Sequence, residues 1–423
     1  MPDLAPEFPR SLFAHKPFAF FWSARVMSTI AFQLQGVAVG WQVYALTHSA
    51  FALGMVGLVQ FLPMLGLTLV VGHVADRYDR RRIIAVCQLV EGLATGFLML
   101  GSIGGWLTPG PIFAAVAVIG AARAFEMPSM QALMPGLVPV SVFPRAAAAA
   151  ASAIQTATIL APAAGGFLYV LGPSVPYGLA GLMSLAACLC SSLIRMERSP
   201  PTRAPVTLAS VFSGFAFIRG NPALLGSISL DLFAVLLGGA TALLPVFARD
   251  ILHTGPWGLG LLRSAPAMGA LAMSVLLAHR PLRQRVGRTM FRAVILFGLA
   301  TILFAFSHWL WLSVAAMVVM GAADVISVVI RSSLVQIGTP DVMRGRVAAV
   351  NSLFVGTSNQ LGEFESGVTA ALFGAVPAVI LGGAGTIVVA LLWMRLFPAL
   401  RDADTLEGFR TAPVPLHPHP SDR

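Results

Sequence analysis

The chain has 423 residues, of which 57% are hydrophobic and only 10% are charged. Soluble domains are typically about 25% charged, so this composition excludes a soluble enzyme and a disordered scaffold and predicts an integral membrane protein. We attribute the net charge of +10 to arginines in cytoplasmic loops rather than to nucleic-acid binding. Lys16 is the only lysine in the sequence, which excludes a Walker A nucleotide site because that motif requires a lysine.

Twelve apolar segments follow one another along the chain. Each is long enough for a helix that crosses about 30 Å of hydrocarbon, and an open sheet is not viable in lipid. The segments cover residues 17–44, 51–73, 83–106, 111–133, 146–171, 174–194, 223–247, 257–279, 290–306, 309–331, 347–371 and 375–397. The sequence therefore predicts an all-α membrane protein with twelve transmembrane helices.

A polar, proline-rich interruption after the sixth segment divides the helices into two sets of six. We expect a cytoplasmic N-terminal segment (1–16), an N-terminal bundle (17–194), a cytoplasmic linker (195–222), a C-terminal bundle (223–397) and a cytoplasmic tail (398–423). Within the linker, residues 207–219 are expected to form a helix at the membrane surface. The tail from Arg401 onward is expected to be loosely ordered because it is polar.

Arginines concentrate in the loops on one side of the predicted membrane. Four lie within 77–82, and others follow the sixth, eighth and tenth segments. The opposite loops contain no lysine or arginine except Arg249. Because positively charged loops stay in the cytoplasm, we expect both termini to be cytoplasmic.

The two halves of the chain resemble each other. Gly57–Pro63 matches Gly260–Pro266, and further on Gly166 matches Gly367 at nearly the same offset. Matches at a nearly constant offset on either side of a central linker favour a duplicated six-helix unit. Parallel repeats of this kind are one architecture of secondary transporters.

The loop between the second and third segments carries the most specific motif. The pattern Gly-x-x-x-Asp-Arg-x-x-Arg-Arg is formed by Gly72, Asp76, Arg77, Arg80 and Arg81. In this motif the sequence resembles the major facilitator superfamily, although Asp79 stands where that family usually has glycine. The resemblance implies a conformational latch, in which Asp76 accepts charge-assisted hydrogen bonds from arginines or a helix N-terminus. A basic loop that only sets the topology is the alternative.

The fifth segment contains Pro162, Gly165 and Gly166 in the pattern Pro-x-x-Gly-Gly. This pattern resembles part of a motif of drug–proton antiporters, although Ala161 stands where that motif usually has glycine. Proline and paired glycines permit a kink and close helix packing. Ordinary helix packing explains the same residues equally well.

Ionisable side chains inside a membrane are costly and usually face a cavity or a partner. The expected proton-coupling acids are Asp231, Asp324, Glu363 and Glu365. The candidates for contact with a cavity or a substrate are Arg25, Gln33, Arg123, Glu126, Arg331, Asn359 and Gln360. Alternating access would move an acid between apolar walls and a nearby arginine, and so couple proton movement to transport. Static ion pairs that hold the two halves together are the alternative.

Three longer stretches narrow the resemblance within the superfamily. Leu230–Pro245, Pro340–Val347 and Ser358–Gly367 are similar to bacterial transporters related to the enterobactin exporter. The resemblance covers essentially the whole membrane region. It implies a proton-driven exporter of a siderophore or another amphipathic metabolite in the bacterial inner membrane.

These features together predict two pseudo-symmetric six-helix bundles that rock about a central cavity and export a small amphipathic molecule. Uptake by proton symport, a membrane sensor or scaffold, and a channel are the alternatives. The expected partners are a small-molecule substrate and the lipid bilayer, without nucleic acid, cofactor or metal, and the internal repeat favours a monomer. No enzymatic activity is expected, because neither a His-Glu-x-x-His nor a Gly-x-Ser-x-Gly motif occurs.

Overall fold

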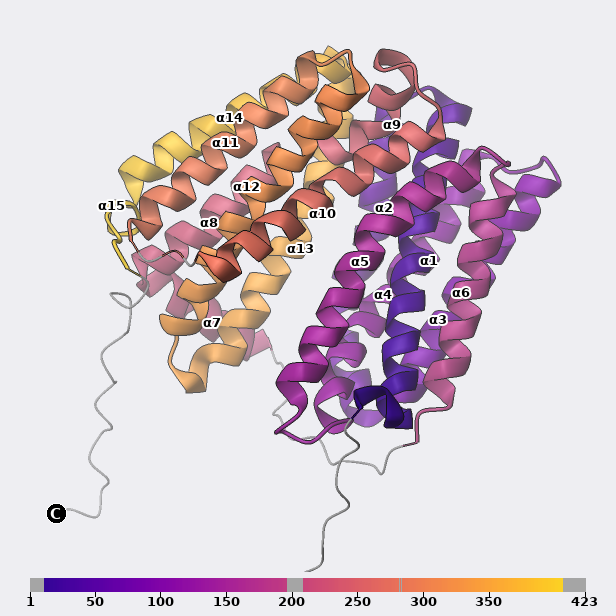
Figure 1. Ribbon diagram of the computed structural model, residues 1–423, viewed down its shortest axis with the longest axis horizontal. Coiled ribbons are helices and arrows are strands. Elements are labelled where there is room, and N and C mark those ends of the chain that lie inside the picture. The colour runs from indigo at the N-terminus through magenta and orange to yellow at the C-terminus, as the bar shows by residue number, and fades with distance from the viewer. Residues whose placement is uncertain (1–10, 196–207, 281, 283, 406–423) are drawn as a thin grey trace, which may run out of the picture.

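The computed structural model describes residues 11–195, 208–280, 282 and 284–405, and for side chains it excludes 68–69, 72–73, 75–76, 208–211 and 341–342. Within these ranges every regular element is a helix (Figure 1). The twelve long helices that match the predicted segments are α1 (Lys16–Thr47), α2 (Ala50–Arg77), α3 (Arg80–Ile103), α4 (Pro109–Leu133), α5 (Phe143–Tyr169), α6 (Ser174–Ser192), α8 (Pro222–Leu237), α10 (Pro256–His279), α11 (Val286–Phe306), α12 (Leu310–Ile337), α13 (Asp341–Phe373) and α14 (Ala375–Leu396). The predicted fold class is therefore confirmed.

Ten helical stretches in the described residues are long and apolar enough to cross a membrane. Among the twelve long helices, α1 and α13 are not in this group, because glutamines, asparagines and acids lower their hydropathy. On α3, large apolar side chains recur every seven residues at Val86, Leu93 and Leu100 and are exposed. Residues seven apart lie on one face of a helix, so this face of α3 is suited to lipid contact.

The seventh predicted segment is not one continuous helix. After α8 ends, the chain forms a 3₁₀ turn (Ala240–Leu243), a short α9 (Leu244–Val246) and a π-helical turn at Phe247–Ile251. Gly239 lies at the break, where an added Cβ would be 2.4 Å from the carbonyl oxygen of Gly362 on α13. A side chain at this position would prevent the two backbones from approaching so closely.

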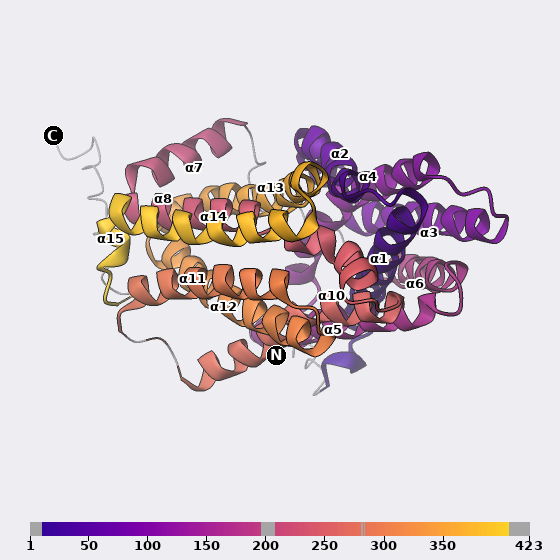
Figure 2. The ribbon, with the colours of Figure 1, turned by 90° about the horizontal axis from the view of Figure 1, so that it is seen from above.

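The helices assemble as two bundles. Helices α1–α6 pack against one another, as do α8 and α10–α14, and the two sets lie side by side (Figures 1 and 2). The main contacts between the bundles are made by α5 with α10 and by α2 with α13. These two contacts are related by the sequence repeat, since α2 corresponds to α10 and α5 to α13. The pseudo-symmetric architecture is thus present in the packing.

The two ends of the molecule differ in how the bundles are joined. We call the end formed by the α1–α2, α3–α4, α11–α12 and α13–α14 connections the arginine-poor end, and the opposite end the arginine-rich end. At the arginine-poor end a single hydrophobic core contains residues of both bundles. Val37 and Leu53 of the N-terminal bundle share this core with Leu243, Leu259 and Phe304 of the C-terminal bundle.

At the arginine-rich end each bundle has a core of its own. One core contains Phe18, Ile84 and Met130 and belongs to the N-terminal bundle. The other contains Leu224 and Met290 and belongs to the C-terminal bundle. The two bundles therefore share one hydrophobic core at the arginine-poor end. At the arginine-rich end their hydrophobic cores are separate.

Two further segments flank the C-terminal bundle. Helix α7 (Leu208–Gly220) packs along α13, with Phe212 and Phe215 exposed, so the predicted helix is present and its place at the membrane surface stays a prediction. The expectation of a loose tail from Arg401 is wrong for its first residues. After α15 (Pro398–Arg401), the carbonyl groups at 403 and 404 accept hydrogen bonds from the first N–H groups of α11, which have no partner within their own helix.

Candidate functional site

A cavity of about 270 Å³ lies in the N-terminal bundle between α1, α4 and α5. Its wall includes Arg25, Gln33, Arg123 and Glu126, four residues that the sequence singled out as cavity or substrate contacts. Two helices bring them together, because Arg25 and Gln33 lie on α1 and Arg123 and Glu126 lie on α4. The wall is apolar as well as charged, because Phe32 and Met127 also line it.

Arg123 and Glu126 form the charged centre of this cavity. The guanidinium nitrogen Nη1 of Arg123 lies 3.5 Å from Oε2 of Glu126, one turn further along α4. The same guanidinium lies over the ring of Phe32, 3.9 Å from its centroid, a geometry that favours cation–π attraction. Arg25 approaches from α1 and is attracted by Glu126.

A buried hydrogen-bond network fixes the carboxyl group of Glu126. Ser28 donates from Oγ to Oε1 of Glu126 at 2.8 Å, and Gln88 donates from Nε2 to the same oxygen at 2.9 Å. Ser191 on α6 in turn donates to Oε1 of Gln88 at 2.8 Å. Because Gln88 accepts from Ser191 through its carbonyl, its NH₂ group is directed at Glu126. Four helices thus fix one carboxyl group.

The C-terminal bundle contains a second charged cluster. Asp231 on α8 forms an ion pair with Arg331 on α12, with 3.1 Å between Oδ2 and Nη1. Both side chains are buried, and Nη1 of Arg331 also donates to Oδ1 of Asn351 on α13 at 3.1 Å. Arg331 therefore has partners on two other helices. If Asp231 lost its charge, Arg331 would still be hydrogen-bonded to Asn351 on α13.

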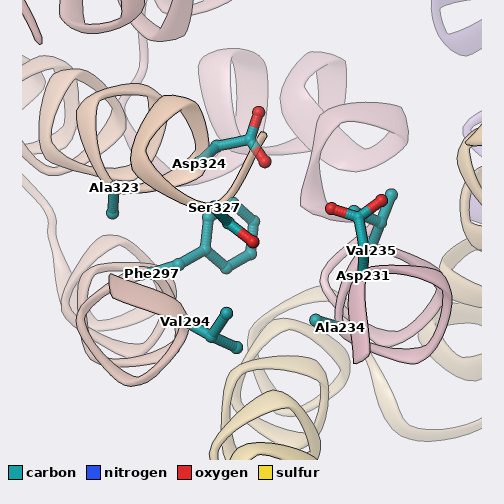
Figure 3. A pocket seen from close by; sticks show the side chains of 8 residues that line it. All are labelled: Asp231, Ala234, Val235, Val294, Phe297, Ala323, Asp324 and Ser327. Atoms are coloured by element: carbon teal, nitrogen blue, oxygen red, sulfur yellow. The ribbon is translucent and has the colours of Figure 1, made fainter. Parts of the chain in front are cut away.

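Asp324 lies near this ion pair. It lines a void of about 20 Å³ together with Asp231, and the two acids project from different helices around that void (Figure 3). A void of this size has room for about one water molecule. Phe297 and Val294 of α11 complete the wall and keep it largely apolar. The structure therefore brings together the two aspartates and Arg331, as proton-coupling and cavity candidates, in one bundle.

A third charged pair lies between the bundles. Arg263 on α10 and Glu363 on α13 attract each other and are both half-buried. A Cβ added to Gly36 on α1 would lie 2.9 Å from Nη1 of Arg263, and one added to Gly57 on α2 would lie 2.7 Å from Oε2 of Glu363. Each charged side chain of the C-terminal bundle is thus accommodated by a glycine of the N-terminal bundle.

The other candidates on α13 are not part of these clusters. Glu365 accepts a hydrogen bond from Thr369 at 2.7 Å, and Asn359 donates to the carbonyl of Val355 at 2.9 Å. Oε1 of Gln360 is buried without a hydrogen-bond partner among the described residues. Glu365 and Asn359 thus form these hydrogen bonds within their own helix, and none of the three side chains lines either cavity.

The motif in the α2–α3 loop is held within the N-terminal bundle. Arg81 donates to both carboxylate oxygens of Asp79 and to the carbonyl of Ile194 at 2.8 Å. These hydrogen bonds from Arg81 hold the pKa of Asp79 below its usual value. Arg80 donates to the carbonyl of Ala132 at 3.3 Å, one of the last carbonyl groups of α4, which lack partners within the helix.

For the other three residues of this motif, Arg77, Gly72 and Asp76, the structure gives only their place in α2 and the exposure of Arg77. Arg77 is exposed at the end of α2. Gly72 and Asp76 also belong to α2, but the side chain of Asp76 lies outside the described residues, and so its predicted role as a latch stays a prediction. The residue that departs from the family pattern, Asp79, is the partner of Arg81.

The glycines of α5 face two different neighbours. A Cβ added to Gly165 would lie 3.3 Å from the side chain of Leu34 on α1, within the same bundle. A Cβ added to Gly166 would lie 2.4 Å from the carbonyl oxygen of Pro256, at the start of α10 in the other bundle. Pro162 lies inside α5, and its carbonyl oxygen is near Gly260 of α10. This part of α5 therefore packs against both bundles.

Sequence reasoning missed two ionisable residues and one contact. Glu91 on α3 contacts Glu126 behind the first cavity, and Arg263 faces Glu363 between the bundles. Both are ionisable residues inside apolar segments, a signal that was sufficient to single them out. Tyr44 on α1 donates a hydrogen bond to Asp250 of the other bundle, and no pattern in the sequence pairs those two residues.

Comparison with known proteins places these features in a family. The model of the family described as transmembrane secretion effector matches residues 8–417. The enterobactin exporter EntS of Citrobacter koseri is 29% identical over 404 residues, which cover 92% of this chain and 93% of that protein. The enterobactin exporter EntS of Shigella dysenteriae serotype 1 is 26% identical over 395 residues, with the same coverage.

Solved structures support the same fold. A bacterial homologue of the human lysosomal transporter Spinster, in an inward-facing and unoccupied conformation, aligns with a TM-score of 0.73 and 14% identity over 96% of this chain and all of that one. The nucleoside transporter NupG, as its D323A mutant, aligns with a TM-score of 0.68 and 15% identity over 89% of this chain and all of that one. At these identities the likeness concerns the fold alone.

Proposed function

The chain belongs to the transmembrane secretion effector family of the major facilitator superfamily, and from this premise we propose that it exports a small amphipathic molecule across the bacterial inner membrane in exchange for protons. That it is a multi-pass membrane transporter follows from the family and the fold. The main observation in support of proton-coupled export is the charged cavity of the N-terminal bundle. The C-terminal bundle beside it contains a buried ion pair of its own.

The unequal ends of the molecule support transport by alternating access. One hydrophobic core joins the bundles at the arginine-poor end, whereas two separate cores lie at the arginine-rich end. If positively charged loops face the cytoplasm, this conformation presents its cavities to the cytoplasm. Rocking the bundles about the contacts of α5 with α10 and of α2 with α13 would close that end and open the other. Both termini are then cytoplasmic.

The chemistry of the cavity supports a substrate with aromatic and hydrogen-bonding groups. Phe32 and Met127 offer apolar surface, Gln33 and Gln131 offer amide groups, and Arg123 offers a guanidinium. The relatives reported above are named as exporters of enterobactin, which supports a siderophore-like substrate. An exporter must take such a molecule from the cytoplasm, the side that the proposed orientation makes open.

Asp231 is the acid that we assign to proton coupling. In the described conformation its charge is balanced by Arg331, and it lines a small void together with Asp324. Protonation of Asp231 would break this ion pair and leave Arg331 with Asn351 and with the charge of Asp324. A buried charge without its partner is costly, so protonation would favour a rearrangement of α8 against α12.

An export assay with a matched control tests the proposal. Wild type, Asp231→Asn and Asp402→Asn are expressed in a host that lacks its main efflux pumps, and siderophores, drugs and metabolites are measured inside and outside the cells. Asp402 is a suitable control because it is an exposed acid whose partners are Arg401 and Arg288. We expect export of at least one siderophore-like compound by wild type and the control, and loss of its dependence on the pH gradient in Asp231→Asn.

Three results would contradict the proposal. Accumulation of the compound inside the cells would indicate uptake, and equal export by host cells without the protein would remove the transport role. Export by Asp231→Asn that still follows the pH gradient would make the ion pair with Arg331 structural.

A further inference from the structure

The cavity of the N-terminal bundle has a second acid behind its wall. Glu91 on α3 lies against Glu126 on α4, and the two residues are only 3% and 2% exposed. An ionised carboxylate has no hydrogen to donate, so two neighbouring carboxyl groups can form a hydrogen bond with each other only if one of them holds a proton. Oε1 of Glu91 is buried and has no hydrogen-bond partner among the described residues.

Hydrogen-bond donors and a positive charge surround Glu126. Ser28 and Gln88 both donate to its Oε1, and the guanidinium of Arg123 lies 3.5 Å from its Oε2. Among the described residues no such donor reaches Oε1 of Glu91. Two carboxylates in contact inside a protein do not both ionise readily, because like charges repel strongly at low dielectric. One shared proton would relieve this repulsion, and Glu91 is the group better placed to carry it.

The charged and titratable groups around the pair can be named element by element. Arg25 on α1 and Arg123 on α4 face it, and Cys87 on α3 interacts with both acids. Helix α6 contains no acidic or basic residue, and the ionisable residues of α2 are confined to its last two turns, at 73–77. One shared proton leaves the two acids with a charge of −1. Loss of that proton gives −2, which the two arginines balance.

Arg123 connects this pair to the cavity. Its guanidinium covers the ring of Phe32, 3.9 Å from the centroid, and remains 3.5 Å from Glu126, which is beyond a good charge-assisted hydrogen bond. An aromatic ligand that stacks on Phe32 would take the place of the guanidinium. Arg123 would then move toward Glu126 and stabilise the fully ionised pair.

We propose that Glu91 and Glu126 form a proton-binding site of the N-terminal bundle, and that an aromatic group stacking on Phe32 expels the shared proton through Arg123. In this step one O–H bond of the carboxyl pair breaks, the proton passes to water in the cavity, and two carboxylates remain opposite two guanidiniums. Binding of substrate and release of a proton are thereby coupled in the sense that antiport requires. The coupling rests on the proposed function, whereas the shared proton does not.

Infrared spectroscopy of the purified full chain tests the site without a ligand. A protonated carboxylic acid has a C=O band that a carboxylate lacks. We expect this band at neutral pH in wild type and in Asp231→Asn, and its loss in Glu91→Gln and in Glu126→Gln. If Glu126→Gln fails to fold, Glu91→Gln alone decides, because the Oε1 atom that it replaces has no partner to lose.

The role of Phe32 and Arg123 is tested by the same band. Phe32→Ala frees Arg123 to approach Glu126, so the band at neutral pH should be weaker than in wild type. Arg123→Gln removes the balancing charge, so the band should be stronger. An unchanged band in both variants would overturn the coupling through Arg123, and a band that is absent from wild type, or present in Glu91→Gln, would overturn the site itself.

The two proposals fail separately. If the band behaves as expected but no compound is exported, the carboxyl pair is still a proton site and the proposed function is wrong. If export follows the pH gradient and depends on Asp231 while the band is absent, the proposed function stands and this inference is wrong.

Discussion

The two ends of the molecule are held by different kinds of contact. At the arginine-poor end, backbone meets backbone across the bundles: a Cβ on Gly367 of α13 would lie 2.5 Å from the Cα of Gly54 on α2, and one on Gly166 would lie 2.9 Å from the Cα of Gly260. At the arginine-rich end, Arg80 and Arg81 bind carbonyl and carboxylate groups of their own bundle.

This difference indicates what each end contributes to a conformational change. Close glycine packing depends on shape and is lost once the backbones move apart, because dispersion contacts fall off steeply with distance. Arginine side chains are long and can exchange one set of acceptors for another. We therefore expect substitutions at the arginine-poor end to change the balance between conformations strongly, and substitutions at the arginine-rich end to change this conformation weakly.

The largest effect is expected for Gly367→Val, which places a branched side chain between the backbones of α2 and α13. Overpacking of this kind typically costs about 1–3 kcal/mol, and it acts on the conformation with the arginine-poor end closed. Spin-label distances between the ends of α2 and α13 should therefore lengthen at the arginine-poor end.

The matched control for this substitution is Gly66→Val on α2. A Cβ at Gly66 would meet no atom within 4 Å, so the distances should remain those of wild type. Equal distances in Gly367→Val and wild type would show that the glycine contact does not hold this end closed.

A smaller effect is expected for Tyr44→Phe, which removes the hydrogen bond from Tyr44 to Asp250 between the bundles. Asp250 is exposed and can be solvated by water, so the loss should be about 0.5–1.5 kcal/mol. Accessibility of engineered cysteines at the arginine-poor end should rise by a corresponding factor of several-fold.

Tyr177→Phe is the control for that loss. The hydroxyl of Tyr177 is buried and has no hydrogen-bond partner among the described residues, so its removal should be neutral or slightly stabilising. The comparison of the ends would fail if both tyrosine variants raised cysteine accessibility to the same extent.

The smallest effect is expected for Asp79→Asn at the arginine-rich end. Arg81 lowers the pKa of Asp79, so this pair contributes stability above the usual Asp pKa near 3.8 and loses it as the pH falls through the lower native pKa. The pair is partly exposed and is worth about 0–1 kcal/mol. Thermal unfolding should therefore differ slightly between Asp79→Asn and wild type at neutral pH and converge in acid. A large difference at neutral pH would show that the Asp79–Arg81 pair fixes this end.

Two pairings show where prediction from the sequence stopped. Asp324 and Arg331 lie seven residues apart on one face of α12, yet Arg331 pairs with Asp231 of α8. Asp76 was expected to accept hydrogen bonds from arginines or a helix N-terminus, and this stays a prediction, whereas the structure shows that Arg81 donates to Asp79 and to the carbonyl of Ile194. In both cases the sequence singled out a charged residue, and the structure supplied its partner.

The sequence by itself determined the twelve helices, their division into two sets of six and the charge difference between the loops. These properties depend on hydropathy along the chain and on the repeat, which are local and additive. Only the tertiary structure decided that Glu91 meets Glu126, that Arg263 and Glu363 fit against glycines of the other bundle, and that one core spans both bundles at a single end. Such pairings depend on how each helix is rotated and tilted against its neighbours, and that is set by close packing of many side chains at once.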